Sequence, residues 1–457
     1  MKDELEFYGG RLFSLVPVGI YTIFCITLFI FLKAFNMEAL AVGGFLALLF
    51  GGLFCKDYGK FWDSVINGIS SKTSVSVIVI LLLVGMFSSL IKTAGLSNGF
   101  LWLASEMGVS GSMFVVFTFI AVCIVSTATG SSIGTMFITY PIFYGSGVLL
   151  GANEALLAGA IISGAIFGDN LAPISDTTIA SASTQSFSNG RPSEIGGVVK
   201  SRLVYSLISA TITIIFYAVF GGVGGTYVGG DILGEETYKS LVMLIPVAIM
   251  LFVTTKTKNI FKGVLVGLTL GTLVGLVFGL FDISAVFAND PSHNEITGYL
   301  VSGINSILPT CALVVSIFGI MGVLTDAGML DYVTDKILNS KHAKTESGAE
   351  LICVLGTAVT TVLFGGVTSA SILTFGPIFN KICSAKNIHP YRRANLLDAT
   401  ANSMPALVPF LSVFVFIGSA LTGLSPVKVA LGSIYGMALS GVVVFSAITG
   451  FARTYEK

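Results

Sequence analysis

The chain has 457 residues, of which 54% are hydrophobic and only 11% are charged. A soluble domain carries about 25% charged residues because its surface must be solvated, so most of this surface must face lipid. The formal net charge is zero and no basic domain stands out, so we expect no nucleic-acid partner. The apolar fraction also excludes a disordered chain. Composition therefore predicts an all-α polytopic membrane protein.

Cysteine and histidine usage argues against a metal centre or an enzyme. The six cysteines and three histidines are scattered, without a CxxC or a Cys/His cluster, so a zinc site is not expected. We expect the cysteines to be small buried apolar residues. The sequence contains no HExxH motif, and no GxSxG or other nucleophile–base pairing can be defended at membrane depth, so we predict that the protein is not an enzyme.

Long apolar runs predict about 10–12 membrane segments, because a helix needs about 20 apolar residues to cross the hydrocarbon core. The charged start, Met1–Arg11, precedes a long run, Leu12–Phe31, that no small-residue cleavage site follows. A retained first helix is therefore expected rather than a signal peptide. The predicted spans lie near residues 12–34, 39–55, 75–93, 112–128, 155–167, 203–224, 240–255, 261–281, 299–325, 350–365, 396–421 and 428–450.

The loop charges predict that both termini are cytoplasmic. Lys and Arg concentrate on the cytoplasmic side of membrane proteins. Basic connections occur at 56–60, 191–202, 256–262, 336–344 and in the tail, and acidic ones occur at 231–239 and 282–295. The residues that do not follow the alternation are Lys33, Lys381, Lys386, Arg392 and Arg393.

An internal repeat runs through the chain. Three pairs of similar segments keep their order at an offset of roughly 235 residues: Ile91–Leu96 with Leu324–Met329, Thr127–Phe143 with Phe364–Phe379, and Asn170–Pro173 with Asn402–Pro405. The first copy follows a basic connection and the second follows an acidic one, so the copies are expected to cross in opposite directions. We predict two inverted repeats, residues 1–230 and 231–457, in one membrane domain. Inverted repeats with broken helices near the midplane are typical of secondary transporters, although a channel could share the plan.

Two hydroxyl-rich, glycine-rich stretches lie at predicted membrane depth. Backbone that is not helical survives there only when it is buried in protein or lines a cavity, so each stretch predicts a re-entrant hairpin tip or a helix break. Exposed carbonyls and hydroxyls at such tips can replace the hydration shell of Na⁺. The alternative is small residues at tight helix crossings. The candidate cavity residues are Thr129, Gly130, Ser131, Ser132, Thr368, Ser369 and Ser371.

The most informative polar segment is Gly168-Asp-Asn-Leu-Ala-Pro-Ile-Ser-Asp-Thr-Thr178. Pro173 disfavours helix at the residue before it, so a break is expected there, flanked by Asp169 and Asp176. Ionisable residues inside a membrane are costly, and function is the default hypothesis. Desolvation favours a protonated carboxyl group and a bound cation favours the ionised form, a competition that proton/sodium exchange requires. The alternative is that Ser175 or Asp176 only caps a restarting helix.

A fourth polar stretch, Asp398–Pro405, matches the 168–178 segment only in part. Asn402 matches Asn170, but Val408 stands where the first copy has Asp176. Asp398 lies about one turn before Asn402 and is a further candidate for the cavity. The acidic residues are therefore unevenly divided between the two halves.

The 168–178 segment resembles the GD-x-x-(S/A)-P-x-SDTT motif of the NhaC-type Na⁺/H⁺ antiporters in the ion transporter superfamily, and the repeat pattern extends the resemblance over nearly the whole chain. The resemblance implies a multi-pass protein of the bacterial cytoplasmic membrane, a scaffold that forms a homodimer, and an elevator-like transport domain. Asn170 departs from the family pattern, where Lys is expected, which removes a positive charge beside Asp169.

The leading hypothesis is a Na⁺-dependent secondary transporter that exchanges Na⁺ and H⁺. Asp169 and Asp176 would carry the cation or the proton, with Asn170, Thr177 and Thr178 beside them. The alternative is Na⁺-coupled transport of a small carboxylate or amino acid. An ion channel, which would conduct without a coupled counter-ion, is the hypothesis from another class. We expect no cofactor, with Na⁺ present only as the transported or coupling ion.

Overall fold

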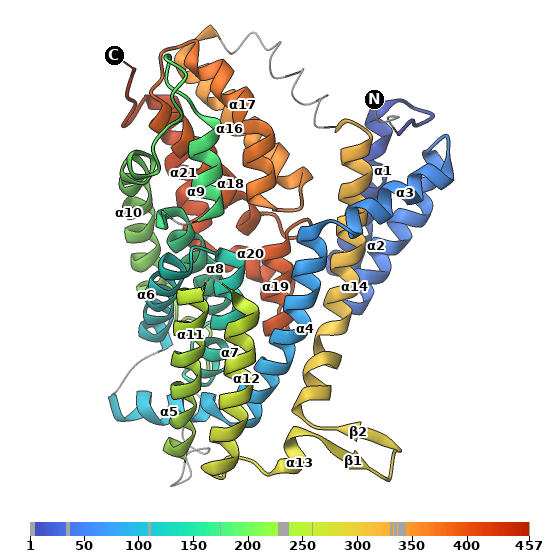
Figure 1. Ribbon diagram of the computed structural model, residues 1–457, viewed down its shortest axis with the longest axis vertical. Helices are drawn as coiled ribbons and strands as arrows, with labels where there is room; N and C mark the ends of the chain where they lie inside the picture. Colours follow the sequence, from blue (N-terminus) through green and yellow to red (C-terminus); the bar gives the residue numbers. More distant parts are fainter. Residues whose placement is uncertain are drawn as a thin grey trace.

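The computed structural model describes residues 5–32, 37–107, 111–173, 175–226, 237–257, 259–329, 332, 336 and 344–456. This part of the chain is almost entirely helical, and the predicted all-α class is confirmed (Figure 1). Its strands, β1 (Ala288–Asp290) and β2 (Glu295–Thr297), form one antiparallel ribbon. Within the described residues, eight helices are long and apolar enough to cross a membrane, or nine if the bent pair α19–α20 is one span, and three shorter apolar helices accompany them.

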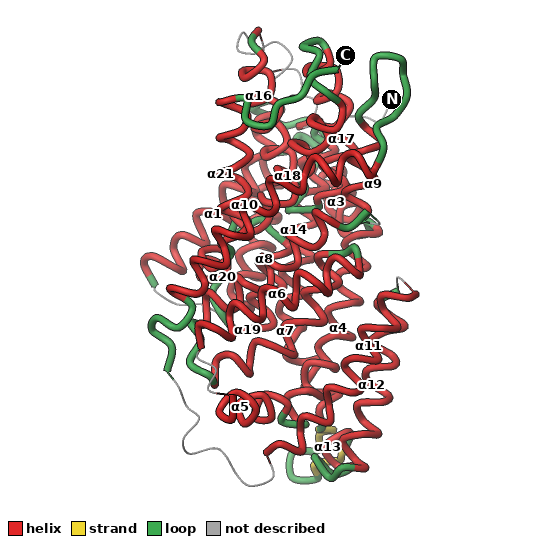
Figure 2. The backbone as a smooth tube through the Cα atoms, turned by 90° about the vertical axis from the view of Figure 1, so that its left-hand side faces the viewer, coloured by secondary structure: helices red, strands yellow, loops and turns green. Residues whose placement is uncertain are grey.

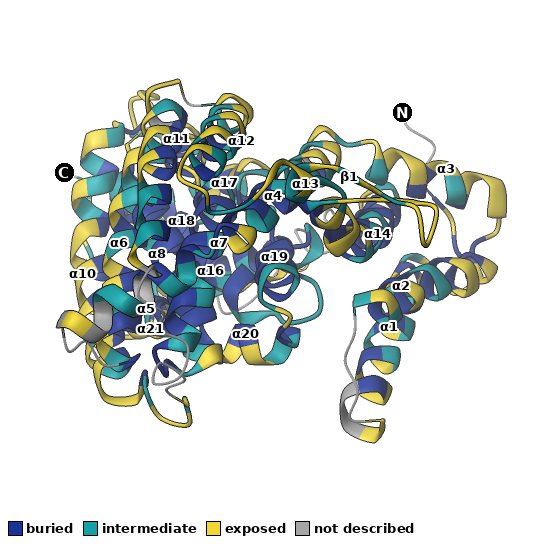
Figure 3. Cartoon of the chain, turned by 90° about the horizontal axis from the view of Figure 1, so that it is seen from below, coloured by how far each residue is buried: buried dark blue, intermediate teal, exposed yellow. Residues whose placement is uncertain are grey.

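One group of helices, which we call the side bundle, extends to one side of the molecule when it is seen from below, with its member α4 between the bundle's other helices and the rest of the molecule (Figure 3). In it α14 packs along α2, α3 and α4, and α1 packs on α2. Its members are α1 (Val16–Ile26), α2 (Met37–Gly51), α3 (Tyr58–Ile69), α4 (Lys72–Thr93) and α14 (Tyr299–Asp326), with the short segments η1 (Arg11–Leu15), η2 (Thr27–Phe31) and η3 (Gly52–Phe54).

The larger group, which we call the central bundle, contains the four predicted polar stretches. Its members are α6 (Gly111–Thr129), α7 (Ser132–Leu149), α8 (Glu154–Leu171), α9 (Asp176–Thr184), α10 (Ile195–Phe220), α16 (Glu346–Leu363), α17 (Thr368–Ser384), α18 (Pro390–Leu407), α19 (Val413–Thr422), α20 (Pro426–Gly432) and α21 (Ile434–Thr449). Burial sorts them: 72% of the apolar window of α8 is buried but only 33% of that of α10. Helix α8 is therefore internal and α10 faces lipid (Figure 3).

The remaining elements lie at the end of the molecule opposite the chain termini. Helix α5 (Leu96–Met107) runs across the bundle and is seen nearly end-on in Figure 2. It packs against η4 (Thr237–Met243), which leads into the hairpin of α11 (Leu244–Thr257) and α12 (Ile260–Val277), and α12 packs on α4. The short helix α13 (Ile283–Val286) precedes β1.

Two broken helices cross the central bundle in opposite directions. Helix α8 ends at Leu171, two residues before Pro173, and the chain restarts as α9, which confirms the predicted break. Helix α18 ends at Leu407 with Val408 extended, and α19 follows. In Figure 1 α9 lies above α8, whereas α18 lies above α19. The α8–α9 segment and the α18–α19 segment therefore run in opposite directions. The division into repeats at residue 230 stays a prediction.

Both chain termini lie at one end of the molecule (Figure 1). There the C-terminal segment pairs Tyr455 with Ile388 across an isolated bridge. Arg392 and Arg393, which the charge alternation could not place, are fully buried near this end. The Arg392 Nε donates to Glu350 Oε1 at 2.9 Å, so this charge belongs to an internal ion pair rather than to a solvated loop.

Candidate functional site

The first hairpin, α6–α7, meets the end of α8 at Asp169. This residue is 1% exposed, and Ser132, at the start of α7, donates from Oγ to its Oδ2 at 3.2 Å. The other carboxylate oxygen, Oδ1, is buried and has no hydrogen-bond partner among the residues that the structure describes. A buried charge without compensation is expensive, so this carboxylate must be neutralised by a proton or by a cation.

Glycine allows the hairpin to approach α8 so closely. A Cβ on Gly168 would lie 2.4 Å from the backbone nitrogen of Thr127, a clash that no side-chain movement removes. The contact also lets Ser126 donate from Oγ to the Ala165 carbonyl at 2.6 Å. At the tip itself Gly130 has a φ of 65°, which a residue with a side chain rarely adopts. Small residues in this region therefore allow both the turn at the hairpin tip and the close crossing with α8. A tight helix crossing was the alternative interpretation of the glycine-rich stretches.

The second hairpin, α16–α17, meets the start of α9 at Asp176. Ser369, in the first turn of α17, donates from Oγ to Asp176 Oδ2 at 2.5 Å. Asp176 is exposed, unlike Asp169, and its Oδ1 accepts from the Thr177 backbone N–H at 3.0 Å. Ser175 is the N-cap of α9, so the capping role foreseen for it is real. The other oxygen of Asp176, Oδ2, remains available to Ser369 of the second hairpin.

An amide contact joins the two broken helices. The Asn402 Nδ2 donates to Asn170 Oδ1 at 2.9 Å, so the two asparagines that match in the repeat touch each other. The same group donates to Asp398 Oδ1 at 2.6 Å and reaches Thr177 Oγ1 at 3.3 Å. All of these side chains are buried, and no described residue forms a hydrogen bond with Asn402 Oδ1.

Arg202 is a buried member of this cluster that the sequence analysis misplaced. It was assigned to the basic connection 191–202, but it lies in α10 and is fully buried. Its guanidinium pairs with Asp398 and donates from Nη1 to Thr178 Oγ1 at 3.0 Å. A buried arginine needs such partners, and this one finds a carboxylate on α18 that sequence spacing does not reveal.

The remaining candidates stay within their own hairpins. Thr129 shares a hydrogen bond with Thr135 at 2.8 Å, and Ser371 shares one with Thr361 at 2.8 Å. Ser131 caps α7 by accepting from the Gly134 N–H at 3.2 Å. Thr368 is buried where α17 begins. These residues shape the tips, whereas Ser132 and Ser369 reach the carboxylates.

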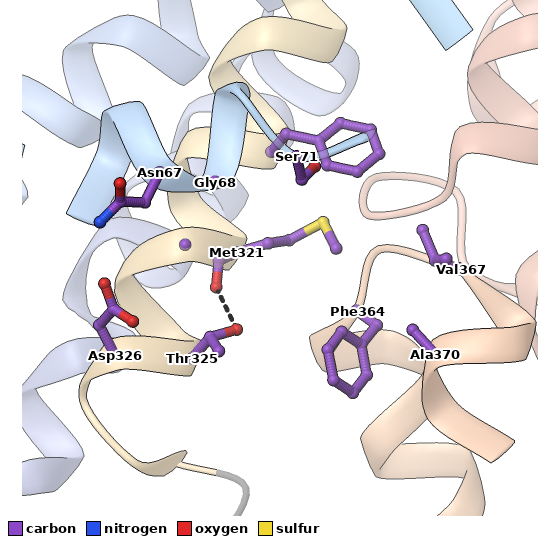
Figure 4. A pocket seen from close by; sticks show the side chains of 11 residues that line it. Asn67, Gly68, Ser71, Met321, Thr325, Asp326, Phe364, Val367 and Ala370 are labelled. Carbon is purple, nitrogen blue, oxygen red and sulfur yellow. Dashed lines mark hydrogen bonds between the residues drawn. The ribbon is translucent and has the colours of Figure 1, made fainter. Parts of the chain in front are cut away.

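A cavity of about 290 Å³ lies between the side bundle and the second hairpin. Figure 4 shows Asn67, Ser71 and Asp326 on one side of it and Phe364, Val367 and Ala370 on the other. Ala370 directly follows Ser369, the partner of Asp176. The cavity therefore borders the first turn of α17, the turn that also contains Ser369.

Comparison with known proteins agrees with the motif. A family model described as the Na⁺/H⁺ antiporter family matches residues 10–222 and 193–451. The chain belongs to the Na⁺/H⁺ antiporter family. It is 25% identical over 419 residues to the Na⁺/H⁺ antiporter NhaC of Alkalihalophilus pseudofirmus, with 87% of each chain covered. The NhaC-type resemblance predicted from the 168–178 segment is thereby confirmed.

Two other relatives carry different names. The chain is 26% identical over 381 residues to the malate-2H⁺/Na⁺-lactate antiporter of Bacillus subtilis, covering 79% of this chain and 78% of the relative. It is 24% identical over 395 residues to the arginine/ornithine antiporter ArcD of Halobacterium salinarum, covering 80% and 77%. The relatives of this Na⁺/H⁺ antiporter family chain thus include proteins named for organic solutes.

The electrostatics of the site suit small ions in this family member. Helices α7, α9, α17 and α19 all begin at the centre, and α17 has no side-chain cap at Val367. Helix N-termini carry partial positive charge, which favours nearby carboxylates such as Asp176. Carboxylate, hydroxyl and amide oxygens are ligands suited to a hard cation.

Proposed function

We propose that this protein exchanges Na⁺ for H⁺ across the bacterial cytoplasmic membrane, with both chain termini in the cytoplasm. The observation that carries the proposal is the buried Asp169, whose Oδ1 has no hydrogen-bond partner within the described part of the chain. One carboxylate oxygen can hold a proton or contribute to a cation site, but the two ligands exclude each other. Competition for Asp169 and Asp176 would couple the two fluxes.

The two-bundle architecture supports an elevator-like form of alternating access. Both carboxylates belong to the central bundle, and the 290 Å³ cavity separates part of that bundle from the side bundle. Movement of the central bundle along α4 and α14 would carry the site from one side of the membrane to the other. The side bundle would remain as the scaffold.

Reconstituted protein in liposomes with an internal pH indicator tests this function. An inward-directed Na⁺ gradient should alkalinise the lumen, because each entering Na⁺ is exchanged for protons that leave, and an equal K⁺ gradient is the control. The expected result is a proton flux that requires Na⁺ and disappears when the Na⁺ gradient is removed. A Na⁺ pulse that moves no protons at any pH from 6 to 9 contradicts the proposal.

A second candidate function is Na⁺-coupled transport of a small carboxylate or amino acid. The cavity that borders the first turn of α17 favours it, since its polar and apolar lining suits a small organic solute (Figure 4). Relatives named for malate, lactate, arginine and ornithine make the same classes of solute reasonable probes. A solute that raises the thermal unfolding midpoint only when Na⁺ is present would favour this candidate over plain exchange.

A further inference from the structure

Arg202 reaches both sides of the break between α8 and α9. Its Nη1 donates to the Asn170 carbonyl, at the end of α8, at 2.6 Å, and to Thr178 Oγ1, in α9, at 3.0 Å. Its Nη2 pairs with Asp398 of α18 and lies 3.4 Å from Ser181 Oγ. One guanidinium thus connects three helix segments at the centre of the site.

The pairing leaves Asp398 fully engaged. Its Oδ2 faces Arg202 and Ser181, and its Oδ1 accepts from Asn402 at 2.6 Å. Asp169 differs, since one of its oxygens has no hydrogen-bond partner in the described ranges of the chain. Both Arg202 and Asp398 are 0% exposed, so their charges cancel inside the protein rather than in water.

We propose that Arg202 is a fixed internal cation of the site. It compensates Asp398, so that Asp398 takes no transported ion, and it sets the net charge that an ion meets at Asp169 and Asp176. It acts on the ion through other residues and is therefore a positioning and charge-setting residue. The inference rests on the proposed binding of Na⁺ at Asp169 and Asp176.

A purely structural role for the same contacts makes a different prediction. If Arg202 only braces the helices, loss of either partner should weaken the fold and Na⁺ binding together, in the same direction. If it sets the charge, loss of Arg202 adds negative charge near the cation and loss of Asp398 adds positive charge. The two single variants should then shift Na⁺ binding in opposite directions.

The experiment measures the Na⁺ concentration that gives half of the maximal thermal stabilisation of the purified full chain in detergent at pH 9. Arg202→Gln should lower this concentration about tenfold and Asp398→Asn should raise it about tenfold, since a unit charge in a poorly solvated site changes cation binding by at least that factor. The double variant should return to within about threefold of the original protein. Arg202→Lys keeps the charge and should also stay within about threefold.

Shifts of the two single variants in the same direction would overturn the inference, as would a double variant that binds Na⁺ no better than Asp398→Asn. If Arg202→Gln does not fold, Asp398→Asn is compared with the double variant. Removal of Arg202 from Asp398→Asn should then lower the half-maximal Na⁺ concentration. Failure of every variant to fold would mark the pair as a structural brace and also overturn the inference. Absence of Na⁺ stabilisation in the original protein contradicts the proposed function instead, so the two failures are distinguishable.

Discussion

The α8–α9 pair and the α18–α19 pair share a backbone plan but hold their carboxylates differently. Each is a helix interrupted at the centre, with an asparagine in the last turns before the break, and the two asparagines touch. In the first pair Asp169 keeps a carboxylate oxygen without a partner, whereas in the second pair Asp398 is held by Arg202 and Asn402. The shared backbone builds the centre, and we propose that the unpartnered oxygen of Asp169 gives the first pair its ion chemistry.

Neutralisation of Asp169 should have the largest effect on transport, because it removes the feature that distinguishes the two pairs. We expect Asp169→Asn to lower Na⁺-dependent proton flux in liposomes by at least about 100-fold, because it removes the charge of the buried carboxylate. The matched control is Glu295→Gln, which removes an exposed carboxylate in β2 and should leave the flux unchanged. Full Na⁺ dependence in Asp169→Asn would show that the unpartnered oxygen is not the ion site.

Neutralisation of Asp176 should have a smaller effect on transport, because this carboxylate is exposed and accepts a hydrogen bond from the Ser369 hydroxyl. We expect Asp176→Asn to raise the half-saturating Na⁺ concentration of transport about tenfold, while the maximal rate falls less. Initial rates over a Na⁺ series measure both quantities. An unchanged half-saturating concentration would restrict cation binding to the α8 side of the break.

The amide contact between the pairs can be tested from either side. Asn402→Ala should destabilise the protein by about 1–3 kcal/mol, since it leaves Asp398 Oδ1 and Asn170 Oδ1 buried without their donor. Asn170→Ala is the matched variant and should cost less, because the Asn170 Nδ2 makes no hydrogen bond to any described residue. Thermal unfolding midpoints in detergent rank the two, and the reverse order would contradict this assignment.

The smallest expected effect is at the second hairpin. Ser369→Ala removes the hydroxyl that donates to Asp176 and should raise the half-saturating Na⁺ concentration about threefold. Ser371→Ala is its control, because Ser371 bonds within the hairpin to Thr361 and should leave Na⁺ binding unchanged. Equal effects of the two variants would mean that the hairpin tip acts through its shape alone.

The sequence predicted the helical class, the break at Pro173 and the group of residues around it. These predictions depend on local rules, since apolar runs identify spans and proline interrupts a helix. The motif placed Asp169 and Asp176 at one site, but their different exposure was not predictable. It depends on tertiary packing, because Asp169 contacts the first hairpin and Asp176 contacts the second.

The role of Arg202 lay outside what the sequence could show. A basic residue near the end of an apolar run is usually interfacial, which is why it was grouped with the connection before α10. Its partner Asp398 lies roughly 200 residues further along the chain, and no local spacing links them. The same limit applied to Arg392 and Glu350, whose pairing also depends on tertiary contact.

The neutral Arg202–Asp398 pair has an electrical consequence. With that pair summing to zero, two carboxylates remain to exchange ions at the broken helix, and exchange of two protons for one Na⁺ would move one net charge per cycle. Moving one charge across 100 mV involves about 2.3 kcal/mol, so such a cycle would respond to membrane voltage whereas a one-for-one cycle would not. The voltage at which the current through reconstituted protein reverses would therefore report how many protons leave Asp169 and Asp176 for each Na⁺ that binds.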